Sequence, residues 1–366
     1  MSFFSNLFGS KPKEPEKPKT REDMENSLSV RYQETRQHGR LQRAFVKRRP
    51  PMDAEKKLLT EMLDIISSTP EGKKLLDQTI KNGYSVAFDA FRGNSDGFMS
   101  GESKQIILCP GNHSSAAALA VTAFHEMVHG VQNERTDVFS NGSRLTMADQ
   151  IKFQRATEAA ACMEESRFAY QIKDAHPEVE RHVSQFPMFG AYKAEMNKSG
   201  DAGKAGEAAF KAWYGYKEFQ SFYEDQDNGN IVYALNDARK KGVKTALTGE
   251  MPSAEVLNTA FISADMAQKI DPAFLESKEA FSLSDESAKH LKAVAGNYAK
   301  AAGAKSVDAS IDRMYSRETG EAFKPRSAEN AAAHSKKSIM SALSEIDSDA
   351  KMKRTAAAKT RAGATR

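Results

Sequence analysis

The sequence predicts an α+β fold that is predominantly helical, with a small mixed sheet early in the chain. Apolar residues recur at helical spacing over most of the stretch from about residue 53 to residue 323. Strand-like runs, by contrast, are short and close together, at residues 84–90 and 104–109. The chain has 366 residues, of which 40% are hydrophobic and 28% charged, so it can bury a substantial core. We therefore expect a sheet-containing domain followed by a helical region.

Two helices are expected before the first strand. The first begins near Asp53, where apolar residues follow at helical intervals (Leu58, Leu59, Met62, Leu63 and Ile66). The second has Thr69 as its N-cap and Pro70 as its first residue, and Gly83 stands where a helix C-cap is expected. These signals predict a helical pair over about residues 53–82.

Short strands are expected next. Tyr84, Val86, Phe88 and Ala90 alternate with other residues, and residues 93–97 supply turn chemistry, after which a short strand returns at 98–99. The run at residues 104–109 is β-rich and stops at Pro110. A third helix then begins with small and apolar residues at 115–124, and a long helical pattern covers about residues 146–173.

The third helix carries the residues with the most specific spacing in the chain, the His-Glu-x-x-His motif His125-Glu126-Met-Val-His129. Residues four apart share a helix face, so both imidazoles can bind one zinc ion. Glu126 then lies beside the metal, where its carboxylate can accept a proton from the attacking water. The uncharged neighbours of the motif indicate that this helix faces a core.

The long helix that follows offers a third ligand. Glu158 is flanked by alanines, which allow two helices to approach closely enough for a carboxylate to reach the ion, and we expect it to be that ligand. Glu164 and Glu165 are alternatives. Glu165 lies two turns after Glu158 on the same face, which also makes it a candidate for the shell of residues behind the ligands.

The motif and its apolar surroundings resemble the zincin metallopeptidases. Metzincins would have a third histidine at position 135, where this chain has an arginine, so the resemblance is to gluzincins, in which a glutamate on a downstream helix completes the site. The usual aspartate four residues after that glutamate is replaced by Cys162. The order of elements over about residues 55–170 also resembles a group of little-characterised bacterial metallopeptidases.

This resemblance implies a zinc metalloendopeptidase with Glu126 as general base. It also implies that a strand beside the metal helix pairs with an extended substrate, and residues 104–109 are a candidate, with an ordinary buried strand as the equal alternative. Hydrolysis requires a donor for the oxyanion. The candidates are Tyr214, Tyr216 and Tyr223, from an aromatic stripe more typical of a core, and His182.

Charge suggests four segments. Residues 1–50 carry 12 Lys/Arg against 6 Asp/Glu and residues 324–366 carry 10 against 4, although the net charge of the whole chain is only +4. We expect a disordered basic arm at 1–50, a zincin-like core at 51–175, a helical region at 176–323 that packs on the core or forms a second lobe, and a disordered basic tail at 324–366.

Composition limits the cellular setting and the partners. Two cysteines are too few for a disulfide framework, and neither a membrane span nor a signal peptide is evident, so a cytoplasmic protein is expected. The basic tail also resembles export signals of bacterial type IV secretion substrates, which makes a secreted effector an alternative. Besides a peptidase acting on proteins or peptides, a catalytically inactive zinc-binding module and an anionic-polymer binder remain open. Basic ends on an acidic body do not favour a nucleic-acid-binding core.

Overall fold

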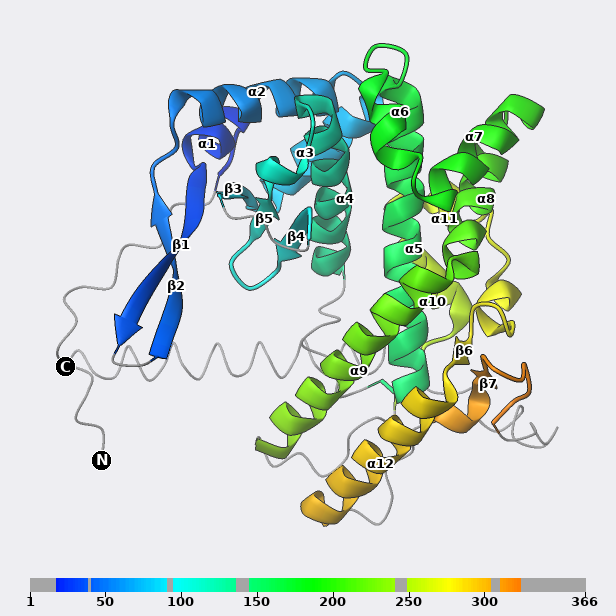
Figure 1. Ribbon diagram of the computed structural model, residues 1–366. Coiled ribbons are helices and arrows are strands. Elements are labelled where there is room, and N and C mark those ends of the chain that lie inside the picture. The colour runs from blue at the N-terminus through cyan, green and yellow to red at the C-terminus, as the bar shows by residue number, and fades with distance from the viewer. Residues whose placement is uncertain are drawn as a thin grey trace, which may run out of the picture. The chain divides into compact units, whose positions relative to one another are not determined.

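The computed structural model describes residues 18–38, 41–90, 95–135, 145–240, 249–303 and 310–323 (Figure 1). Two compact units divide the chain. The first comprises residues 1–136, 157–213 and 261–269, and the second comprises residues 137–156, 214–260 and 270–366. The division falls inside one long helix, α5 (Met147–Ile172).

A mixed sheet lies in the first unit, and helices predominate around it. The strands are β1 (Ser29–His38), β2 (Leu41–Arg49), β3 (Ser85–Asp89), β4 (Gly97–Ser100) and β5 (Gln105–Leu108), in the order β2-β1-β3-β5-β4. Pairing is parallel between β1 and β3 and between β3 and β5, and antiparallel for the β1–β2 hairpin and for β4 with β5. The expected small mixed sheet is therefore present.

Two helices of the first unit, α2 and α3, begin where the sequence signals place them, at Asp53 and Pro70. The Thr69 side chain accepts a hydrogen bond from the backbone N–H of Gly72, and Gly83 follows the helix with a positive φ of 80°. Among the described residues, seven helices lie wholly in this unit, and α8 ends just beyond it. The bounds are α1 (Arg21–Asn26), α2 (Asp53–Ser67), α3 (Pro70–Lys81), α4 (Ala116–Arg135), α6 (Glu178–Val183), α7 (Pro187–Ser199), α11 (Ala264–Ala267) and α8 (Ala202–Gly215).

An apolar core joins the sheet to α1–α7. It includes Met62 from α2, Ile106 from β5 and Phe124 from α4, all at most 2% exposed. Phe168 of α5 stacks on Phe124 with ring centroids 4.4 Å apart. The residues that carry the histidine motif are thus held by packing on both the sheet and α5.

β5 is an interior strand, since it pairs with β3 on one side and β4 on the other. Its four residues are all buried. Of the two roles considered for residues 104–109, the ordinary buried strand is therefore the one observed. Because β4 ends the strand order, it forms the edge of the sheet nearest to α4.

Residues 18–38 and 41–50 correct the expectation of a disordered arm. Thr20 caps α1 with a reciprocal capping box, and Met24 and Val30 are fully buried. The charged residues that suggested disorder pair instead, since Lys47 contacts Glu34 across the hairpin and Arg49 binds Glu55 at 2.6 Å. Residues 1–17 lie outside the described residues, as does the expected tail at 324–366.

The second unit is built mainly from helices around its own core. Its elements are the first part of α5, α9 (Lys217–Lys240), α10 (Ser253–Ala260), the 3₁₀ helices Pro272–Glu276 and Ile311–Arg313, α12 (Asp285–Ala302), and the strands β6 (Ser282–Leu283) and β7 (Tyr315–Ser316). Ile151, Leu291 and Ile311 are fully buried in its core. Arg155, 1% exposed, donates to the Ser282 carbonyl at 2.5 Å and lies 3.4 Å from Asp227.

The boundary expected at residues 175/176 differs from the observed division. Residues after 176 belong partly to the first unit because Val179, Val183 and Phe189 are buried in the same core as the sheet. No helix among the described residues is both long enough and apolar enough to cross a bilayer.

Candidate metal centre

α4 holds the His-Glu-x-x-His residues on a helix that is buried along most of its length. The turns before the motif consist of small and apolar residues, and Met127, Val128 and Val131 are fully buried. Gly130 faces Tyr84, because a Cβ at this position would lie 3.5 Å from the phenol ring. This packing fixes the rotation of α4 and hence the direction in which both histidines point.

α5 supplies the acidic side of the centre. Ala159, Ala160 and Ala161 are fully buried, so small side chains surround Glu158 at the approach of the two helices. Glu158 Oε2 lies 3.3 Å from His129 Nε2 and 3.8 Å from His125 Nε2. The two Nε2 atoms are themselves 3.0 Å apart. Three potential ligand atoms therefore converge on one point between the helices.

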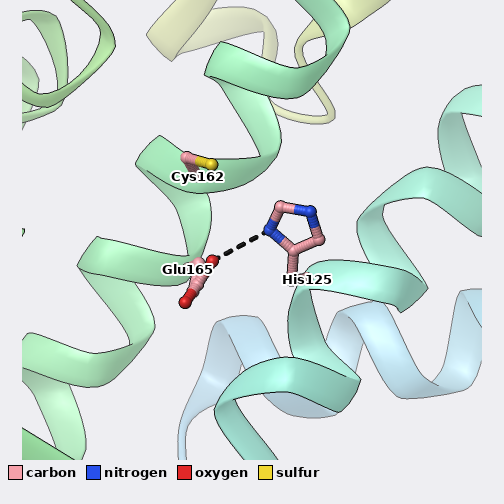
Figure 2. Close-up of side chains that lie close together, drawn as sticks. All are labelled: His125, Cys162 and Glu165. Atoms are coloured by element: carbon pink, nitrogen blue, oxygen red, sulfur yellow. Dashed lines mark hydrogen bonds and ion pairs between the residues drawn. The ribbon is translucent and has the colours of Figure 1, made fainter. Parts of the chain in front are cut away.

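The opposite nitrogen of each imidazole is engaged by a different partner. His125 Nδ1 lies 2.9 Å from the carboxylate of Glu165, and His129 Nδ1 lies 2.8 Å from Gln132 Oε1 (Figure 2 for His125). The orientation of the Gln132 amide is set because its Nε2 donates to the Thr157 carbonyl at 3.1 Å. Both Nδ1 atoms thus face acceptors and carry the proton.

When both histidines are neutral, as metal binding requires, this arrangement leaves a lone pair on each Nε2. Two lone pairs at 3.0 Å, with the Glu158 carboxylate beside them, repel one another unless a cation lies between them. Glu158 Oε2 is buried and makes no well-directed hydrogen bond among the described residues. The donor set and its orientation therefore fit a divalent metal ion.

Electrostatics within the cluster follow from burial and proximity. Burial raises the pKa of Glu126, and attraction to His125 and His129 offsets this only in part. Burial would also raise the pKa of Glu158, but without a metal the two histidines, whose own pKa values are raised, are protonated and hold the pKa of Glu158 well below its usual range. The two glutamates thus differ in proton affinity, as a base and a ligand require.

Glu164 points away from the cluster. It lies 3.3 Å from Arg167, which also pairs with Glu71, and both partners line a cavity of about 530 Å³ bordered by α5, α7 and α11. Of the three glutamates considered on α5, the structure therefore brings Glu158 to the Nε2 atoms and Glu165 to a Nδ1 atom, and Glu164 to neither.

The four expected oxyanion donors are divided between the two units. Tyr214, Tyr216 and Tyr223 belong to the second unit, where Tyr214 packs edge-on against Phe274. His182 lies in the first unit, and its ring centroid is 5.5 Å from that of His113.

His113 links that histidine pair to the metal helix. Its Nε2 lies 2.8 Å from the hydroxyl of Thr122, which precedes Glu126 by one helical turn on the same face. Burial lowers the pKa of His113, so its ring is neutral at physiological pH. His182 is thus connected to α4 through His113 and Thr122.

Comparison with known proteins identifies a family for the part of the chain that contains this cluster. Residues 36–262, more than half of the chain, match a family model described as "Putative metallopeptidase family (DUF6782)". The chain belongs to this metallopeptidase family. The match spans α4 and the whole of α5, so both sides of the cluster lie within it. Neither a curated protein nor a solved structure matched the chain. Membership in the metallopeptidase family implies a bound metal ion and protein or peptide substrates.

Several residues around the centre had no clear signal in the sequence. Gln132 follows His129 by three residues, and that spacing alone would have permitted the contact, but a glutamine there is also an ordinary helix residue. Cys162 is a departure from the gluzincin pattern, and its sulfur lies within 4.8 Å of a ring nitrogen of His125. Burial raises the pKa of that thiol to about 11.

Proposed function

We propose that this protein is a zinc-dependent metalloendopeptidase of the gluzincin type, with His125, His129 and Glu158 as ligands. The observation that carries the proposal is the convergence of two Nε2 lone pairs and one carboxylate oxygen at 3.0–3.8 Å. In a tetrahedral site with zinc–ligand bonds of about 2.0–2.1 Å, ligand atoms lie about 3.3 Å apart. The observed separations bracket that value.

The donor set favours zinc. Two imidazoles and a carboxylate with one open position are typical of hydrolytic zinc sites. When bound, zinc supplies a Lewis acid that lowers the pKa of a water at the open position and polarises the scissile carbonyl. Glu165 and Gln132 orient the histidines and raise their basicity through the Nδ1 hydrogen bonds.

Glu126 has the position and the proton affinity of a general base. It follows His125 directly on α4 and is 8% exposed, and its burial raises the pKa of the carboxyl group. In the proposed mechanism it accepts a proton from the attacking water and then delivers one to the leaving amine. His182 is our candidate to stabilise the oxyanion, because it approaches α4 through His113.

The edge strand β4 is the proposed partner of the substrate backbone. A Cβ on Gly97, at the start of β4, would lie 3.1 Å from Thr122, and one on Gly101, just after β4, would lie 2.9 Å from Asn133. The two ends of the strand therefore approach α4 at Thr122 and Asn133, which flank the His-Glu-x-x-His motif in the sequence. Within the described residues β4 pairs with β5 alone, so its outer backbone groups can bind an extended peptide.

Glu126→Gln tests this function, with Glu134→Gln on the same helix as a matched control. Glutamine keeps the shape of Glu126 but cannot accept the proton, so the variant should retain zinc and its melting temperature while losing about 10²–10⁴ in rate. Glu134→Gln should retain hydrolysis. The measurement is zinc content, thermal unfolding and cleavage of an unfolded-protein library on the same preparations.

Unchanged hydrolysis in Glu126→Gln would refute the general-base assignment. A parent protein that binds zinc and cleaves nothing would instead support the non-catalytic zinc module.

A further inference from the structure

His125 takes part in a second group of ligand atoms, on the side of its ring that faces α5. The ligand atoms of His125, Cys162 and Glu165 all lie within 4.8 Å of one another. Figure 2 shows the Cys162 sulfur and the Glu165 carboxylate, one turn apart on α5, both directed toward the same imidazole. Glu165 lies at Nδ1 of His125, whereas His129 and Glu158 lie at its Nε2.

The chemistry of this group differs from that of the first. It combines a sulfur, an imidazole nitrogen and a carboxylate oxygen, and thiolate ligands select zinc and its heavier, softer congener cadmium over hard cations such as magnesium. Cys162 is 5% exposed, whereas the side chains of His125 and Glu165 are 13% and 18% exposed. The group is thus enclosed yet reachable from the side of the exposed carboxylate.

We propose that His125, Cys162 and Glu165 form a second site for a thiophilic divalent cation, and that its occupation inhibits the protein. One imidazole then bridges two ions, through Nε2 to the first and through Nδ1 to the second. Binding releases the thiol proton of Cys162 and the Nδ1 proton of His125 to solvent, and no oxidation or reduction is involved. Once Glu165 binds the second ion, it no longer accepts the hydrogen bond from His125 Nδ1. His125 then loses the partner that orients it as a ligand of the first ion.

Cadmium is the probe, because a cadmium–thiolate bond gives an ultraviolet charge-transfer absorption that imidazole and carboxylate ligands do not give. The zinc-loaded full-length protein should take up one further equivalent of Cd²⁺ with this absorption. Cys162→Ala should show neither. The matched control is Cys109→Ala, which removes the other cysteine of the chain and should retain both. Absence of the absorption in the parent protein, or its persistence in Cys162→Ala, would overturn the proposal.

His129→Ala separates this site from the proposed catalytic one, since it removes a ligand of the first site only. With its fold checked by circular dichroism, it should keep the cadmium–thiolate absorption. Loss of the absorption in the folded variant would show that the three residues do not suffice as a site, against the proposal.

Only the inhibition rests on the proposed function. Cadmium uptake should lower peptide hydrolysis by the parent and by Cys109→Ala about 10–100-fold, the usual effect of disturbing a partner of a metal ligand. The ratio of rates with and without cadmium should stay near one in Cys162→Ala. A protein that shows the thiolate absorption but never hydrolyses peptides would refute the peptidase and leave the second site standing. Full hydrolysis with the second equivalent bound would refute the inhibition.

Discussion

At the scale of single residues, the position of two protons decides what the centre can bind. Glu165 and the amide oxygen of Gln132 each fix a proton on Nδ1, so both histidines present a lone pair to the same point. The motif predicts which residues are near the ion, but it does not reveal the partners that set the tautomers. Spacing did make Glu165 a candidate for the residues behind the ligands, but the contact of Gln132 also depends on the orientation of one amide, which spacing does not encode.

Gln132→Ala should weaken zinc binding about 10–100-fold, because His129 loses the acceptor that orients its ring. Asn133→Ala is the matched control from the next position, since Asn133 donates to the Tyr84 hydroxyl and contacts neither histidine. Competition with a chelator of known affinity measures both. Equal affinities of the two variants would contradict this role for Gln132.

Glu158→Ala should lower zinc affinity more than Gln132→Ala does, because it removes one of the three ligands and the negative charge that attracts the cation. Glu164→Gln, on the same helix, should bind zinc like the parent, since Glu164 pairs with Arg167 instead. Zinc titrations of the three proteins provide the test. If Glu158→Ala bound zinc as tightly as the parent, the third ligand would have to be sought at Glu165.

At the scale of helices and strands, the sequence predicted the elements that carry strong local signals. The capped helix from Pro70 and the helices of residues 116–135 and 147–172 lie where periodicity and caps indicated, and β3 and β5 also match. The sequence did not predict the β1–β2 hairpin because its many charged residues are typical of a solvated arm. The hairpin also depends on pairing between β1 and β3, which is distant in the sequence.

Two glycines of the first unit should respond to alanine in opposite ways. In Gly72→Ala the new Cβ would overlap the carbonyl oxygen of Ile66, so we expect a destabilisation of about 1–3 kcal/mol. In Gly130→Ala the new Cβ would make an ordinary contact 3.5 Å from Tyr84, and alanine favours the helix by roughly 0.5–1 kcal/mol. Urea unfolding of both variants gives the comparison, and a stabilised Gly72→Ala would contradict the packing of α3 on α2.

At the scale of the molecule, the chain forms two units with separate cores, and the charge pattern could not predict where they divide. The observed boundary cuts through α5, between Ala156 and Thr157, and no break in composition marks it. Residues far apart in the sequence belong to the first unit because they are buried in the same core. Val179, for example, is buried together with residues of the sheet.

The second unit should lose stability in acid through Asp149. This side chain is 1% exposed, and although burial raises the pKa of Asp149, Lys152 at 3.0 Å and Arg313 at 2.8 Å bring it below the ordinary value of 3.8. Because the folded pKa is depressed, the stabilisation is fully present above about pH 4 and declines as the pH falls through the lower folded pKa.

Asp149→Asn should therefore destabilise the second unit by about 3–5 kcal/mol at neutral pH, and by less in acid. The exposed Asp225→Asn is the control and should have little effect. Thermal unfolding from pH 7 to pH 2 measures the difference. A gap between Asp149→Asn and the parent that is independent of pH would contradict the ion-pair origin of the effect.

The edge strand β4 has only four residues, Gly97–Ser100. This short edge limits which proteins the proposed enzyme could bind as substrates. Only a chain segment already in an extended conformation can pair along such an edge, and segments held in a native helix or an interior strand cannot. Cleavage of a folded protein would then require that segment to open first. Among variants of one substrate protein, the rate of cleavage should depend more on the free energy of local unfolding around the cleaved bond than on the identity of the residues that flank it.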